Sequence, residues 1–268
     1  MTASGAIDWA IQAGGAFSDG GYGIAYDGAG GALVTGSFYS NASFGLTSLT
    51  SSGEYEHAFV MHVASSGVID WAIQVSGTSS SQGLGITYDG AGGALVTGEL
   101  SGEASFGLTS LTSRGEFDAF VMHVTASGVI DWAIQAGGTS FDRGYGIAHD
   151  GVGGALVTGY FYGNASFGST SFTSRGMHDA FVMHVTASGA IDWVIQVGGT
   201  FYDRGYGIAH DGAGGALVTG DFYGKASFGS KTLTTSQGTA ATCFVASVVL
   251  VVPVVPVVPG GEVQWRCV

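Results

Sequence analysis

The chain has 268 residues, of which 46% are hydrophobic, 49 are glycine and only 27 are charged (7 basic and 20 acidic). High hydrophobicity with few charges excludes a disordered chain, and glycine without a strict three-residue period excludes collagen. The net charge of −13 disfavours binding to nucleic acid or to an anionic membrane surface, because both require clustered Lys and Arg.

Frequent glycine also disfavours helices. Outside the C-terminal tail the longest stretch without glycine, residues 54–66, has 13 residues, and each interior glycine costs a helix about 1 kcal/mol. The most apolar run, 248–258, has 11 residues and contains two prolines, which is well short of the ~20 residues that a membrane-spanning helix needs. Residues 1–5 have neither the basic nor the apolar region of a signal peptide.

An internal repeat dominates the sequence. Four tryptophans, each in the phrase Ile-Asp-Trp, are spaced by 62, 61 and 61 residues: Trp9, Trp71, Trp132 and Trp193. The phrase Asp-Gly-Ala-Gly-Gly-Ala-Leu-Val-Thr-Gly follows the same spacing, with Val152 replacing alanine in one copy. The one extra residue between the first two tryptophans lies within 54–57, which indicates a loop. The chain therefore contains about four copies of a 61-residue unit.

The sequence of one unit predicts four strands, described here in chain order. Residues 145–149 form the first, a glycine-rich turn follows, and 155–158 form the second. A polar stretch over 163–178 is expected to hold an irregular hairpin. The third strand, 180–185, is apolar on both sides, as in a sheet covered on both faces. The fourth, 191–197, alternates apolar and polar residues.

Such a unit cannot bury both faces alone and must stack on its neighbours. We expect an all-β fold, a β-propeller of four-stranded blades, with a β-solenoid or an open fragment of a longer array as alternatives. The expected organisation is a partial repeat with a lone outer strand (1–14), blades at 15–75, 76–136 and 137–197, an incomplete blade at 198–247, and a Val/Pro-rich insertion with a candidate closing strand (248–268).

The runs Asp-Arg-Gly-Tyr-Gly-Ile-Ala (142–148), Gly-Gly-Ala-Leu-Val-Thr-Gly (153–159) and Asp-Ala-Phe-Val-Met-His-Val (179–185) resemble SBBP-type β-propeller repeats. The resemblance covers nearly all of residues 2–247. It implies a propeller and, since such repeats are common in secreted and surface proteins, an extracellular or cell-surface location. It implies no catalytic residue, because the family has no assigned activity.

The two cysteines, Cys243 and Cys267, are too few for a disulfide-stapled scaffold. The tail phrase Gly-Glu-Val-Gln-Trp-Arg-Cys echoes the fourth strand of a unit, and aligning it places Cys243 on Ala180 and Cys267 on Ile195. In a tight hairpin these two positions face each other, which predicts a Cys243–Cys267 disulfide. A bulged turn would shift the register and prevent it, and two unrelated cysteines are the alternative.

The repeated motifs are better explained as structural features of the repeat than as ligand-binding or metal-binding sites. The Gly-Ala-Gly-Gly loops lack the Gly-Lys-Ser/Thr ending of a phosphate loop and lead into strands. His62, His123 and His184 recur at the same position of successive units, which are too far apart to share a zinc ion. We expect these histidines to be hydrogen-bonded between neighbouring blades. No metal site, catalytic residue or cofactor is predicted.

Two less regular features carry the remaining site predictions. Asp142, Arg143, Asp203 and Arg204 begin the presumed innermost strand of two units, near the mouth of a central channel, and are the candidate ligand-binding residues. A structural salt link is the alternative. Asn41 and Asn164 begin glycosylation sequons at equivalent positions, where the other units have Glu and Lys. Three unlike residue types at one position predict solvent exposure.

The sequence is compatible with three functional hypotheses. The first hypothesis is a non-enzymatic scaffold, from a secreted or surface protein, that binds protein or glycan through its loops. A hydrolase or lyase that uses the channel is the second, and a fragment without independent function is the third. The sequence does not determine the oligomeric state.

Overall fold

The computed structural model describes residues 5–52, 54–235 and 240–249, and every regular element within them is a β-strand. The all-β expectation is therefore confirmed. The sequence explains it directly, because β-branched and aromatic residues alternate with turns whose glycines adopt positive φ, such as Gly151 (88°) and Gly189 (81°).

Each repeat forms an antiparallel meander, and the four meanders are called the first to fourth sheets. The first sheet contains β2 (Gly20–Tyr26), β3 (Ala32–Tyr39), β6 (Glu56–Val63) and β7 (Ile69–Gln74). The second contains β9 (Ser81–Tyr88), β10 (Ala94–Leu100), β13 (Asp118–Val124) and β14 (Ile130–Gly138). The third contains β15 (Arg143–His149), β16 (Ala155–Phe167), β17 (Thr170–Val185) and β18 (Ile191–Gly199). The fourth contains β19 (Asp203–His210), β20 (Ala216–Tyr223) and β23 (Ala241–Val248).

A small hairpin extends each meander at the polar stretch of the repeat. Its strands are β4 (Asn41–Phe44) and β5 (Thr47–Thr50), β11 (Glu103–Phe106) and β12 (Thr109–Thr112), the paired ends of β16 and β17, and β21 (Lys225–Phe228) and β22 (Lys231–Thr234). The first hairpin strand pairs with two small residues that precede the unit: β1 (Gly14–Gly15), β8 (Ser76–Gly77), and the ends of β14 and β18. These pairings link each unit to the fourth-strand segment before it.

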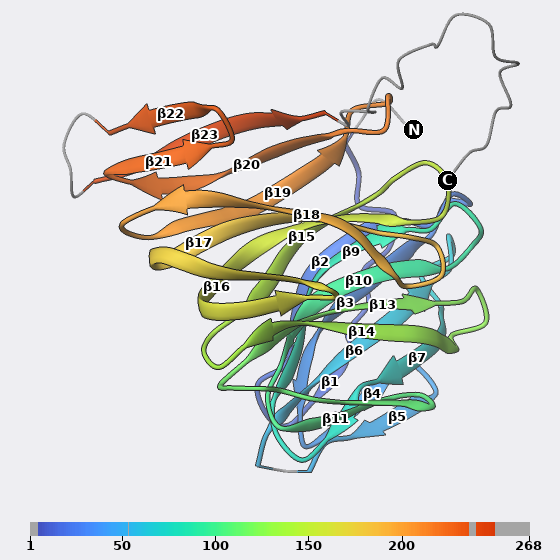
Figure 1. Ribbon diagram of the computed structural model, residues 1–268. Helices are drawn as coiled ribbons and strands as arrows, with labels where there is room; N and C mark the ends of the chain where they lie inside the picture. The colour runs from blue at the N-terminus through green and yellow to red at the C-terminus, as the bar shows by residue number, and fades with distance from the viewer. Residues whose placement is uncertain (1–4, 53, 236–239, 250–268) are drawn as a thin grey trace, which may run out of the picture.

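The sheets are stacked face to face in chain order, and the orange and red strands of the fourth sheet form one end of the stack (Figure 1). Their first strands β2, β9, β15 and β19 are neighbours. Each junction contains a hydrophobic core, in which leucine and valine of one sheet meet phenylalanine of the next, together with methionine at the first two junctions and Ala246 at the third. Leu33 and Val60, for example, pack with Phe120 and Met122. The ladders of these sheets are antiparallel, whereas a parallel β-helix would pair its coils in parallel.

The two ends of the stack differ from the expected closed ring. The outward face of the first sheet leaves Ile24 71% exposed, and that of the fourth leaves Val245 78% exposed. The equivalent residues inside the stack, such as Ile86 and Val121, are buried. Closure of the first sheet on the fourth is therefore not seen in the described residues.

The predicted lone outer strand is not formed in the described residues before Gly14. Residues 5–13 carry no strand, and regular pairing begins at β1. The segment nevertheless packs on the first sheet, since the Trp9 indole donates to the Ser65 carbonyl (3.1 Å), as Trp71 and Trp132 do to Ala126 and Ala187 in the next units. The insertion and candidate closing strand after residue 249 lie outside the described residues.

Candidate functional site

The repeated histidines each lie between two aspartates. His62 Nε2 lies 2.9 Å from Asp27, in the turn between the first two strands, and its Nδ1 lies 2.9 Å from Asp70 on the fourth strand. His123 and His184 repeat this arrangement. Both aspartates belong to the histidine's own sheet, so the expectation of hydrogen bonds between blades was wrong. The reason is a β-bulge beside each histidine, which sends the unpaired aspartate toward the ring.

This Asp–His–Asp arrangement, called the relay, is structural. The second oxygen of Asp150 accepts N–H bonds from Val152 and Gly154 and so shapes the glycine-rich turn. Although burial acts to raise it, these bonds and the one from His184 lower the pKa of Asp150, and Asp27 and Asp89 behave alike. Carboxylates engage both ring nitrogens of each histidine, which leaves no nitrogen to activate a nucleophile.

Replacing Asp150 with asparagine is expected to cost about 1–2 kcal/mol at neutral pH, because the amide keeps the turn bonds and loses the charged bond to His184. A lowered folded-state pKa contributes stability above the unfolded pKa of about 4 and loses it as the pH falls through the folded value. The difference between wild type and Asp150→Asn should therefore shrink below pH ~4 in urea unfolding. Asp211→Asn is the matched control and should have little effect, because Ser247 replaces the histidine there. Equal losses in the two variants would contradict the role of the histidine.

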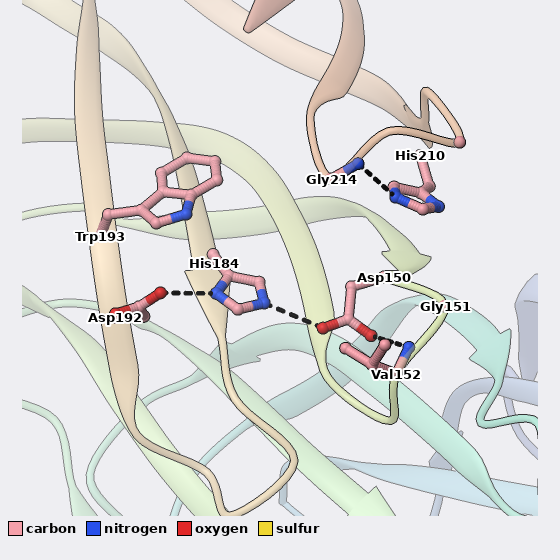
Figure 2. Close-up of a pocket in the computed structure, with 9 residues that line it drawn as sticks. Asp150, Gly151, Val152, His184, Asp192, Trp193, His210 and Gly214 are labelled. Carbon is pink, nitrogen blue, oxygen red and sulfur yellow. Dashed lines mark hydrogen bonds and ion pairs between the residues drawn. The ribbon is translucent and has the colours of Figure 1, made fainter. Parts of the chain in front are cut away.

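A pocket of about 370 Å³ lies next to the third relay, between the third and fourth units. Figure 2 shows His184 between Asp150 and Asp192, with the Trp193 ring above it and His210 across the opening. The His184 and Trp193 rings are stacked at 5.9 Å. At the preceding junction the next unit's Ala187 turn receives the tryptophan N–H. In the fourth unit this turn corresponds to residue 250, outside the described residues, and we assign no ligand to the pocket.

The predicted ligand residues Asp142 and Asp203 are fully buried. Asp142 accepts N–H bonds from Gly138 (2.7 Å) and Tyr162 (3.1 Å), and Asp203 accepts one from Gly199 (2.7 Å). Burial raises the pKa of each to about 7. These carboxylates tie the start of the first strand to neighbouring backbone, and the structure does not present them to a ligand.

Arg143 and Arg204 have different surroundings. Arg143 pairs with the buried carboxylate of Glu99, and burial raises the pKa of Glu99 to about 7 although the arginine opposes the shift. Arg204 lies over the rings of Tyr160 (5.7 Å) and Tyr202 (5.3 Å). Among the described residues no carboxylate lies within 4.0 Å of it. Arg204 is therefore a cation held by aromatic rings.

Polar contacts hold Arg204 in place. Its Nε donates to Nδ1 of His178 (3.3 Å), and its Nη1 donates to the hydroxyl of Tyr206 (3.4 Å), which donates to Asp221 (3.3 Å). Burial, together with the charges of Arg204 and Arg143, lowers the pKa of His178 to about 4, so the ring is neutral and can accept this bond. The set is called the aromatic edge and contains Tyr160, His178, Tyr202, Arg204, Tyr206 and Asp221.

The aromatic edge is chemically distinct from the same edge of the first unit. There, Gly20 occupies the position of Arg204, and the hydroxyl of Tyr22 bonds to Ser37 (3.2 Å). Sequence reasoning identified Arg204 and missed the other members. The signal was nevertheless present: the otherwise constant phrase Leu-Val-Thr-Gly is followed by a different residue in each unit, Ser37, Glu99, Tyr160 and Asp221.

The remaining site predictions concern modification. Asn41 and Asn164 are exposed at the start of the small hairpins, as expected from the variety at this position, and their side chains accept hydrogen bonds from Thr50 and Thr173. Their glycosylation stays a prediction.

Cys243 is exposed in β23, whereas Cys267 lies outside the described residues. The register that suggested their pairing is wrong in the third unit. There, the bulge places Ala180 opposite Val197, and Val182 opposite Ile195.

Within the described ranges no group of three or more His, Cys, Asp or Glu residues is arranged to hold a metal ion. The same residues contain no helix long and apolar enough to cross a bilayer.

Comparison with known proteins adds little to this picture. No family model matches the sequence, and no curated protein matches it. A crystal structure of a protein of unknown function from Bacteroides caccae is similar in part, with a TM-score of 0.42 and 12% sequence identity. The match covers 84% of this chain and 61% of that protein, so the chain corresponds to under two thirds of its length.

Proposed function

We propose that this chain is a non-catalytic repeat scaffold that binds protein or glycan through the aromatic edge of its third and fourth units. The observation that carries the proposal is Arg204, a cation held between tyrosines without a carboxylate partner in the described residues. Arginine and tyrosine are enriched among the residues that dominate binding energy. Tyr206, which bonds to Arg204, and Tyr162, which contacts His178, are exposed at this edge.

The fold and setting form part of the same proposal. The stacked meanders with neighbouring first strands support blades of a propeller of the SBBP type. The exposed sequons at Asn41 and Asn164 support a secreted or cell-surface location. The intact mass of protein from its natural source tests the location, because glycans would add to the 27.0 kDa of the chain.

The alternative of a hydrolase or lyase draws on the raised pKa values of Asp142 and Asp203, since a catalytic acid needs such a pKa. Their burial and their bonds to backbone amides account for these carboxylates without chemistry. We therefore favour binding over catalysis.

A microarray of neutral and anionic oligosaccharides tests the glycan form of the proposal. We expect Arg204→Gln and Tyr206→Ala to weaken binding at least about ten-fold, which corresponds to about 1.4 kcal/mol. Tyr26→Ala is the control, because Tyr26 is also exposed on a first strand but lies at its opposite end in the first unit. Equal loss in all three variants would contradict the assignment to the aromatic edge. Absence of binding across the array would reject the glycan form.

A further inference from the structure

The internal junctions share one close contact. A fully buried threonine of one sheet packs on a glycine of the next, in the pairs Thr35–Gly83, Thr97–Gly144 and Thr158–Gly205. A Cβ atom built on any of these glycines would lie 2.0 Å from the threonine Oγ1. Only glycine admits this approach between neighbouring sheets, so the contact marks where one unit meets the next.

The two halves of this contact remain unmatched at the ends of the stack. Thr219, the equivalent threonine of the fourth sheet, is exposed. Gly21, the equivalent glycine of the first sheet, has no threonine against it: a Cβ there would make only an ordinary contact with Val34, at 3.7 Å. The fourth sheet thus ends in a threonine face and the first sheet begins with a glycine face.

The apolar side chains of these faces are also complementary. Leu217 and Val245 project from the fourth sheet, at positions that are buried in the inner sheets. The outward face of the first sheet has a cavity of about 150 Å³ beside Gly21, lined in part by Phe59 and Met61. At the first internal junction, Phe120 and Met122 hold the same positions and pack against the leucine and valine of the preceding sheet.

Strand pairing gives a third complementary feature. In the described residues the fourth sheet has three strands, and β23 pairs only with β20. Residues 7–12 have the fourth-strand sequence Ile-Asp-Trp-Ala-Ile-Gln. They lie against the first sheet where a preceding unit would place its fourth strand, as the bond from Trp9 to Ser65 shows. This segment could add to the edge of β23 that has no partner strand among residues 5–52, 54–235 and 240–249, in another molecule.

From these features we infer that a second copy of the chain docks head to tail, with the glycine face of its first sheet on the threonine face of the fourth. Residues 7–12 of one copy complete the fourth sheet of the other. The contact is heterologous and can close when each copy uses both faces. Two copies then contribute eight sheets in all, within the four to eight blades of known propellers. This inference is independent of the proposed ligand-binding role.

Cysteine cross-linking between separately purified variants tests the contact. Gly21→Cys and Thr219→Cys are placed in different chains, each in a background with Cys243→Ala and Cys267→Ser. Mild oxidation of the mixture should give a covalent species of twice 27.0 kDa that contains one chain of each kind. Either variant alone should give much less of it, because two like faces do not meet.

The same cysteines distinguish the competing arrangements. When both are placed in one chain, a cross-linked monomer, together with no dimer from the mixture, would show closure within one molecule and overturn the inference. The internal pair Thr97→Cys and Gly144→Cys in one chain is the positive control and should cross-link within the monomer at any concentration. Absence of every Gly21–Thr219 cross-link, with the control formed, would also overturn it.

Sedimentation velocity provides an independent measurement. Wild type should shift from monomer toward dimer as its concentration rises. Val245→Glu and Ile24→Glu, at opposite faces, should each abolish the shift, because each buries a carboxylate in the contact. Leu108→Glu is the control, since Leu108 is fully exposed in a hairpin tip away from both faces. A wild type that stays monomeric, or equal behaviour of all three variants, would contradict docking between copies.

Discussion

Replacing Leu156 with alanine is expected to destabilise the protein by about 2–5 kcal/mol, the cost of removing a buried leucine side chain. Leu156 is 1% exposed and packs between the third and fourth sheets with Val182 and Val218. The same change at Leu217 should cost about 1 kcal/mol or less in the monomer. Leu217 has the same place in its repeat but is 46% exposed. Urea unfolding at low protein concentration compares the two variants.

The part of the chain that Leu156→Ala destabilises first can also be predicted. In a repeat protein each unit is stabilised by its nearest neighbours, and in the described residues the fourth sheet packs on the third alone. Leu156→Ala should therefore accelerate amide hydrogen exchange in β19, β20 and β23 before it affects the first sheet. Equal acceleration throughout the chain would show that the stack unfolds as a single cooperative unit.

Replacing Gly144 with alanine is also expected to lower the stability of the protein strongly. The new methyl group would lie 2.0 Å from Oγ1 of Thr97, which is buried and donates to the Phe120 carbonyl at 2.8 Å. Because the threonine is short and already bonded, the sheets must separate, at a cost of about 1–3 kcal/mol.

Gly21→Ala is the matched control for this change. A Cβ at Gly21 would make only an ordinary contact with Val34, at 3.7 Å, so alanine should be neutral or should stabilise the monomer by about 0.4–1 kcal/mol through the unfolded chain. Thermal unfolding of both variants checks the pair. A stable Gly144→Ala protein would mean that the junction is looser than the structure indicates. The double variant Gly144→Ala, Thr97→Ser should recover little stability, because serine keeps the obstructing hydroxyl.

Much of the fold could be predicted because the repeat presents the same local signals four times. The turns, the four strands and the small hairpin of residues 163–178 all follow from glycine positions and apolar alternation, and the structure confirms them. The strands are longer than predicted. The third strand starts at Thr170 rather than at residue 180, because hairpin and meander share continuous chains.

The register and the site could not be predicted in the same way. The bulge that leaves Asp192 unpaired carries no glycine signal, since what stabilises it is the contact of that carboxylate with His184. The aromatic edge was missed for a related reason. Tyr202 and Tyr206 flank Arg204 in the fourth unit, but Tyr160 belongs to the third unit, and only the stacking of the two sheets brings it beside Arg204.

The indole bonds between successive units have a spectroscopic consequence. Trp9, Trp71 and Trp132 each donate to a backbone carbonyl in the following turn. An indole held in this way emits differently once the neighbouring turn departs and water reaches the ring. Variants that retain one tryptophan, with phenylalanine at the others, would therefore give each junction its own fluorophore. Their melting curves would give the order in which the units separate.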